Sequence, residues 1–221
     1  VAPLVVVRAA QRLAGAEPTH RTMVVAEPPS DERRGELQKL WAEAIDCWVE
    51  PPGADGEVIY FCPVAPSNAT TEEATAWLPA VLDSAQPFGG VYSLTAFNPM
   101  GEERPFGVNQ KQNEELEAEI RALCSAPGRR WWRSFGFSKD WHEKGFTVAA
   151  PQAEVVELAR KYNQGAIYRF YRDTADDSSA LFKRETVPVG LDETEADVRI
   201  WRCPKPPLER AEPDWEPPAT S

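Results

Sequence analysis

Apolar residues recur at helical spacing in four stretches of the chain, and each stretch predicts a helix. Ser30 or Asp31 is placed to cap the first of these helices, and two prolines at 51–52 stop it. Thr70 and Glu73 have the spacing of a capping box at the start of the second. The four predicted helices cover residues 31–48, 70–82, 109–124 and 151–163.

Short apolar or alternating runs predict the strands. They cover residues 58–62, 91–97, 131–138, 145–150, 166–172 and 198–203. From residue 91 onward the order is strand, helix, two strands, helix, strand. This order predicts a ferredoxin-like α+β fold, a βαββαβ antiparallel sheet with both helices on one face. The added N-terminal helices are expected to cover the other face.

Proline divides the chain into a regular core and irregular ends. Of its 21 prolines, only Pro99, Pro105, Pro127 and Pro151 lie between residues 88 and 187. We therefore expect an N-terminal extension over 1–35, a single α+β domain over 36–203, and an extended Pro-rich arm over 204–221. The first 25 residues contain arginine and alanine and little acid, as an organelle transit peptide does; an ordinary chain end is the alternative.

Composition excludes several classes of function. The net charge of −11 disfavours nucleic acid as a partner. No stretch approaches the roughly 18 unbroken apolar residues of a membrane helix. The 4 cysteines form no C-x-x-C pair and there are only 2 histidines, so neither a metal site nor a cofactor is predicted. Reduced, mostly buried thiols favour an intracellular protein.

Three asparagines form the first candidate site. Asn98 ends the predicted 91–97 strand, while Asn109 and Asn113 share a helix face with Leu116 and Ile120. Because that face should be buried, the two helical amides need partners. They either bond the backbone of the loop that precedes the helix or bind a polar or anionic ligand at its N-terminus.

The polar residues stand in a recognisable series of motifs. Residues 95–99 read T-A-F-N-P, 109–116 contain N-x-x-x-N-x-x-L, 141–148 read W-H-E-K-G-F-T-V, and 162–166 read Y-N-Q-G-A. Over roughly residues 88–172 this series resembles the bacterial family called domain of unknown function 3293 (DUF3293). Two positions depart from its pattern: Phe97 replaces a tryptophan and Asn163 a glycine. The resemblance implies a shared fold and the site positions Thr95, Asn98, Asn109, Asn113, Glu143 and Gln164, but no reaction.

Glu143 and Gln164 each allow two interpretations. Glu143, at the start of a predicted strand, is either a general base or a carboxylate that anchors a loop. Gln164 follows a helix end, where capping and backbone bonding are the simpler role. Neither residue belongs to a zinc-hydrolase or nucleotide-binding motif.

A basic and aromatic cluster suggests a surface for a partner. Tryptophan and arginine are enriched at protein interfaces, and the acidic net charge argues against base stacking. The interface candidates are Arg129, Arg130, Trp131, Trp132, Trp201 and Trp215. We therefore predict a non-catalytic accessory subunit of an organellar complex, photosynthetic or respiratory, whose partners are other protein subunits. The alternative is a domain that binds or transforms a small polar ligand through the Asn/Glu/Gln set.

Overall fold

The computed structural model describes residues 30–64, 79–137, 141–174, 181–190 and 198–203. Its helices are α1 (Asp31–Glu43), α3 (Val81–Ser84), α4 (Phe106–Leu123) and α5 (Gln152–Lys161), with short 3-10 turns at Gln86–Phe88 and Pro99–Gly101. Its strands are β1 (Ile45–Val49), β2 (Ile59–Cys62), β3 (Val91–Leu94), β4 (Arg130–Phe137), β5 (His142–Ala149), β6 (Ala166–Asp173), β7 (Leu181–Pro188), β8 (Val198–Arg199) and β9 (Trp201–Cys203).

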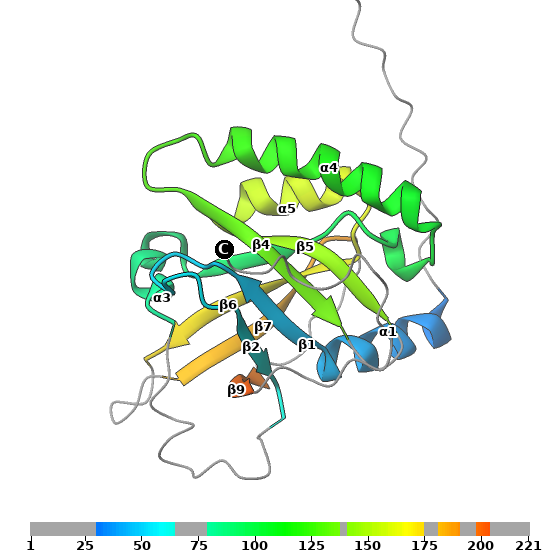
Figure 1. The fold of residues 1–221 in the computed structure, drawn as a ribbon. Helices are drawn as coiled ribbons and strands as arrows, with labels where there is room; N and C mark the ends of the chain where they lie inside the picture. The colour runs from blue at the N-terminus through cyan, green and yellow to red at the C-terminus, as the bar shows by residue number, and fades with distance from the viewer. Residues whose placement is uncertain (1–29, 65–78, 138–140, 175–180, 191–197, 204–221) are drawn as a thin grey trace, which may run out of the picture.

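The nine described strands form one antiparallel sheet in the order β8-β7-β6-β3-β5-β4-β1-β2-β9. The two outermost strands, β8 and β9, are separated along the chain by Ile200 alone. A single segment, 198–203, therefore pairs with β7 on one side and with β2 on the other. The sheet curls into a nearly closed barrel, and this segment closes it (Figure 1).

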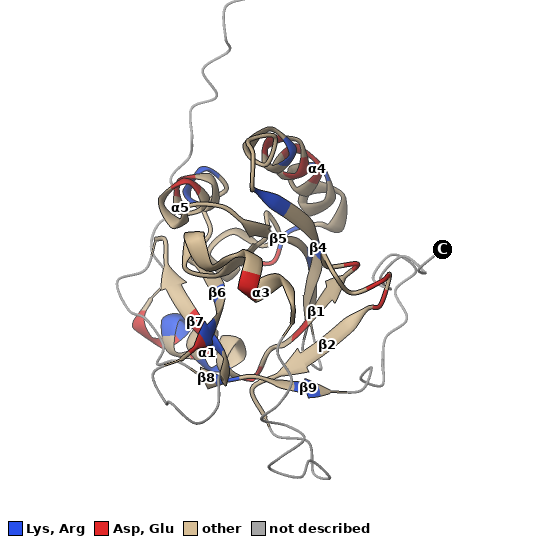
Figure 2. Ribbon diagram, turned by 90° about the vertical axis from the view of Figure 1, so that its left-hand side faces the viewer, with Lys and Arg blue, Asp and Glu red and all other residues tan. Residues whose placement is uncertain are grey.

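Aromatic side chains fill one half of the barrel. Alternate residues of each strand point inward, and Trp48 on β1 lies at the centre of this group, with four aromatic rings in edge-on contact around it. Helix α3 lies across the same end of the barrel (Figure 2). The inward cluster consists of Trp48, Ile59, Phe61, Val81, Leu82, Ala85, Val91, Trp132, Ala149, Phe170, Phe182 and Ile200.

Helices α4 and α5 cover the outer face of β3, β4, β5 and β6 on one side of the barrel (Figure 1). Leu116 and Ile120 of α4 and Val155 and Ala159 of α5 pack there against outward side chains such as Val148. The helical spacing predicts these buried faces correctly, and β3 is an interior strand between β5 and β6.

The predicted ferredoxin-like fold is wrong. The sheet does not end with the four strands β6, β3, β5 and β4: β1, β2 and β9 extend it on one side, and β7 and β8 on the other. Its second face is therefore not covered by added helices but rolls inward and is filled by the sheet's own aromatic residues. Strand β7 was not predicted, and its pairing with the whole length of β6 starts this extension.

The predicted 31–48 helix is also wrong in its last five residues, 44–48. Ser30 caps α1 by accepting a hydrogen bond from the Arg33 N–H at 3.3 Å, but the helix ends at Glu43. Residues 45–49 become a strand because they pair with both β2 and β4 and bury side chains on both faces. The predictions for 1–29, for most of the 70–82 helix and for 204–221 lie outside the described residues.

Candidate functional site

The polar residues of the family motif surround the backbone of segment 95–98, just beyond the end of β3. Three side chains accept hydrogen bonds from its amides: Asn113 Oδ1 from Ala96 N at 3.2 Å, Thr95 Oγ1 from Phe97 N at 2.9 Å, and Asn109 Oδ1 from Asn98 N at 3.0 Å. Gln164 Nε2 donates to the Phe97 carbonyl at 3.1 Å. Side chains thus replace the strand partners that this segment lacks.

Asn98 adopts a left-handed backbone conformation with φ 44°, which Asn tolerates better than most residues. Its side-chain oxygen accepts from Arg104 N at 3.0 Å and from Asn109 Nδ2 at 2.8 Å. Asn109 Nδ2 also donates to the Arg104 carbonyl at 3.2 Å. Asn98 and Asn109 therefore fix the 99–105 loop from both of its ends.

Glu143 is the ionisable member of this group. Asn98 Nδ2 donates to its Oε1 at 2.9 Å, and no described residue donates to its second oxygen. Burial raises the pKa of Glu143 to about 7, although the bond from Asn98 acts in the opposite direction. A carboxyl with this pKa exchanges protons at neutral pH, as a general acid or base does.

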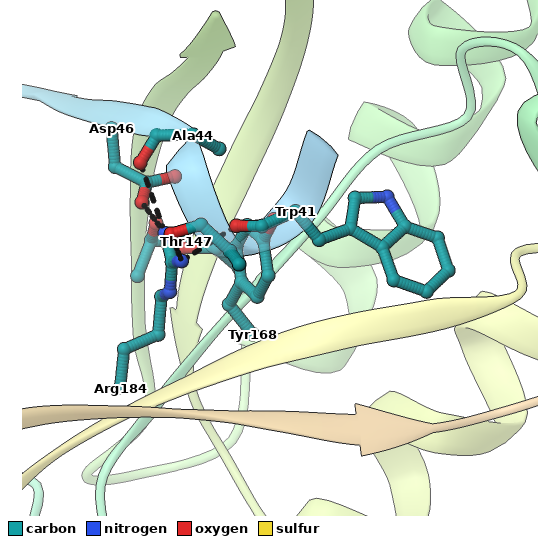
Figure 3. A network of polar contacts seen from close by, with 8 residues as sticks. Trp41, Ala44, Asp46, Thr147, Tyr168 and Arg184 are labelled. Carbon is teal, nitrogen blue, oxygen red and sulfur yellow. Dashed lines mark hydrogen bonds and ion pairs between the residues drawn. The ribbon is translucent and has the colours of Figure 1, made fainter. Parts of the chain in front are cut away.

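A second polar network occupies the half of the barrel interior next to α1 (Figure 3). The fully buried Arg184 on β7 forms an ion pair with Asp46 on β1, with 2.8 Å between Nη1 and Oδ2. Arg184 also donates to the Trp41 and Ala44 carbonyls at 2.6 and 3.2 Å. Its guanidinium stacks over the Tyr168 ring at 4.3 Å.

This network fastens α1 to the barrel. Carbonyls at the C-terminal end of a helix lack partners within the helix and carry partial negative charge, so a cation is favoured there. Arg184 supplies that cation, and the Tyr168 hydroxyl donates to the same Trp41 carbonyl at 3.1 Å. Burial raises the pKa of Asp46 to about 6 despite the neighbouring Arg184.

Asp46 and Glu143 lie in one row across the sheet. In the strand register Asp46 is opposite Gly136, and Gly136 is opposite Glu143. Directly opposed residues share a face, so both carboxyls belong to the inward face, with a glycine between them. The Trp141 ring lies 3.6 Å from the position that a side chain on Gly136 would take. The row thus combines two acids of raised pKa.

The interface candidates occupy different surroundings. Trp132 is a buried member of the interior cluster, whereas Arg130 is exposed. The two terminal guanidinium nitrogens of Arg129, Nη1 and Nη2, donate to the Glu154 carboxylate at 2.7 and 2.8 Å, and Arg121 stacks on Trp131. Trp201 is partly buried and stacks with Arg199, while Trp215 lies outside the described residues.

Sequence reasoning placed Thr95, Asn98, Asn109, Asn113, Glu143 and Gln164 in one set, and the structure brings all six around segment 95–98. It missed Asp46 and Arg184, which are 138 positions apart. One available signal was an isolated charge in an apolar, alternating run: Arg184 stands two residues from Phe182, and Asp46 two residues from Trp48.

Among the described residues, no group of three or more His, Cys, Asp or Glu side chains is arranged to hold a metal ion. None of the helices in the described ranges is both long and apolar enough to cross a membrane.

Comparison with known proteins confirms the resemblance. The model of the family described as a protein of unknown function (DUF3293) matches residues 94–167. No curated protein and no solved structure matches the chain. The matched segment contains the whole set from Thr95 to Gln164, but neither Asp46 nor Arg184.

Proposed function

We propose that this protein is a non-catalytic accessory subunit that binds other protein chains in a larger assembly. The observation that carries the proposal is the use of the family's amide side chains. Asn98, Asn109, Asn113 and Gln164 bond their own chain, where they hold segment 95–98 and its loop in place. Such amides stabilise a scaffold and leave little capacity for a substrate.

The first turn of α4 offers a surface for a partner. Phe106 and Val108 are 39% and 46% exposed, although the same helix buries Leu116 and Ile120 completely. The Phe106 ring lies 5.3 Å from the Lys144 ammonium, which gives the apolar surface a charged border. An aromatic residue with a polar border is typical of a protein-binding surface. The transit-like composition of residues 1–25 supports a search for the assembly in a plastid or mitochondrion.

The test compares native size in extracts of cells that produce the full chain. We expect the protein to migrate far above its own 24.6 kDa, and the double variant Phe106→Ser/Val108→Ser to shift toward the free chain. Val64→Ser is the matched control, since Val64 is 65% exposed and lies outside α4. Migration of the wild-type chain at its own mass after mild cross-linking would contradict the proposal.

Glu143 favours a second candidate function, the binding or transformation of a small polar ligand. Its pKa near 7 and its second oxygen, to which no described residue donates, suit a group that exchanges a proton with a ligand. In a screen of small polar compounds by thermal shift, a true ligand should stabilise the wild-type chain but not Glu143→Gln. A stabilisation retained by Glu143→Gln would place binding elsewhere.

A further inference from the structure

Three of the four cysteines lie on one face of the sheet beside the segment that closes the barrel. Cys47 on β1 and Cys203 on β9 both stand opposite Tyr60 of β2, and Cys62 stands two residues from Tyr60 on the same strand. Opposed residues and residues two apart share a face, so all three thiols lie on one side. It is the outer side, because Phe61 points into the barrel.

Cys62 and Cys203 are the two members of this group that can react. They are diagonal neighbours on paired strands, with Cys203 two residues from Trp201, the residue opposite Cys62. Both are partly exposed, whereas Cys47 is buried. The two neighbouring thiols shift each other's pKa in opposite directions: the pKa of Cys62 falls to about 7 and that of Cys203 rises. At neutral pH Cys62 is thus the better nucleophile, since the thiolate is the reactive form.

We propose that Cys62 and Cys203 form a reversible disulfide that joins β9 to β2 where the barrel closes. The oxidant is a low-molecular-weight disulfide such as oxidised glutathione. The Cys62 thiolate attacks one of its sulfurs and expels one small thiolate, which takes up a proton. Cys203 then gives up its proton and attacks the Cys62 sulfur, so that the second small thiol leaves. Two protein thiols and one small disulfide become one protein disulfide and two small thiols.

The position of this bond gives it an effect on the whole barrel. Strand β9 has three residues, and its pairing with β2 is the last contact that closes the sheet. A bond between residues 62 and 203 also closes a long loop of chain, which reduces the conformational freedom of the unfolded state. We expect oxidation to raise the melting temperature, on the order of 5 °C for a domain of this size.

The experiment equilibrates the full chain in glutathione buffers of graded ratio, alkylates the remaining thiols and maps linked peptides by mass spectrometry. The expected product is a peptide pair joined through Cys62 and Cys203, lost again on reduction. The melting temperature should rise on oxidation of the wild-type chain and stay constant in Cys203→Ser. Cys124→Ser is the matched control, because Cys124 is partly exposed and burial raises its pKa to about 11.

Three outcomes would overturn the proposal. They are full alkylation of both cysteines at every glutathione ratio, a disulfide between a different pair, and a stable mixed disulfide on Cys62 that Cys203 does not resolve. Because these results come from the wild-type chain, they do not depend on whether a serine variant folds.

Discussion

Asn113 supplies the acceptor that the Ala96 amide would otherwise find in a neighbouring strand. Asn109 does the same for Asn98, one turn earlier in the helix. Helix α4 therefore supplies hydrogen-bond acceptors that a neighbouring strand would otherwise supply, since its side-chain oxygens take the place of strand carbonyls. The spacing of four between these residues is a requirement of that geometry, because alternate backbone amides must be reached from one helix face.

Replacing Asn113 by Leu tests this role. The substitution leaves the buried Ala96 amide without its acceptor, so we expect the free energy of unfolding to fall by about 1–3 kcal/mol in urea titrations. Lys111→Leu, at an exposed position of the same helix, should leave it nearly unchanged. An equal effect of the two substitutions would contradict the role that we assign to Asn113.

Glu143 should make stability depend on pH. Its pKa is about 7 in the folded chain, above the 4.5 of an ordinary glutamate, so the folded state holds its proton more tightly than the unfolded state. Stability is therefore highest below pH 4.5 and falls as the pH rises to 7. Asp46, with a pKa of about 6, acts the same way at lower pH, so the fall between pH 6 and 7.5 belongs mainly to Glu143.

Urea titrations at pH 6 to 8 check this expectation. Glu143→Gln should remove most of the loss between pH 6 and 7.5. Because the Glu143 side chain is partly exposed, we expect a gain of about 1–3 kcal/mol at pH 8 and not the full value of the pKa shift. Glu103→Gln, an exposed carboxyl, should keep the wild-type slope. A slope that persists in Glu143→Gln would mean that another group titrates.

At this scale the sequence was informative for contacts within one helix and its neighbouring loop. Helical spacing turns Asn109 and Asn113 toward Asn98, and the family motif adds Glu143 and Gln164 to them. Nothing local relates Asp46 to Arg184, because their meeting depends on how β1 and β7 are placed by the closed sheet. The meeting of Cys62 and Cys203 could not be predicted for the same reason.

Among the elements, α1 is held to the barrel at its C-terminal end by hydrogen bonds from Arg184 and Tyr168. Its end is bound by Arg184, whose charge is balanced by Asp46. Removing one member of a buried ion pair leaves the other charged and without compensation, which costs about 3–5 kcal/mol. We therefore expect Arg184→Met to lower the free energy of unfolding by that amount and to increase hydrogen exchange in α1.

Two further variants separate charge from packing. Arg172→Met breaks the exposed pair with Asp83, which is 2.7 Å long against 2.8 Å for the buried pair, and should cost less than about 1 kcal/mol. The double variant Arg184→Met/Asp46→Leu should recover part of the loss, because it leaves no buried charge. Equal losses in the single and double variants would show that Arg184 acts through its contacts with α1 alone.

The boundary between α1 and β1 shows why elements are misread from sequence. Leu40, Trp41, Ala44, Ile45 and Trp48 follow a helical stripe, but that spacing arises from two elements joined end to end. Residues 45–49 pair on both sides, with β2 and β4, and this tertiary pairing outweighs the local pattern. Where the spacing belongs to one element, as in α4 and α5, the helices were predicted nearly to their ends.

For the whole molecule, two C-terminal truncations, one that keeps the segment 198–203 and one that removes it, should differ in melting temperature. Deletion of 204–221 leaves every described pairing of the barrel in place, so we expect the melting temperature to stay within about 2 °C of the full chain. Deletion of 198–221 removes β8 and β9 together with the buried Ile200. It should lower the melting temperature by well over about 2 °C. Calorimetry of the two proteins measures both melting temperatures. If the protein that lacks only 204–221 is unfolded, these residues belong to the core.

The closure of the barrel could not be predicted from the sequence, because it depends on pairing between strands that are far apart along the chain. The strands from β3 to β6 follow one another with the helices between them, and that order suggests an open sheet. The closed form requires that residues near 60 meet residues near 202, and no periodicity encodes that contact.

One short segment thus shields two sheet edges at once. Without 198–203, β7 and β2 would both present free backbone amides and carbonyls, and edges of this kind recruit strands from other molecules. The β7 edge of one copy could accept the β2 edge of the next, a head-to-tail contact that does not close on itself and so grows into a fibre. Proteolytic nicking or incomplete synthesis near residue 198 would then turn a folded chain into a seed for polymerisation.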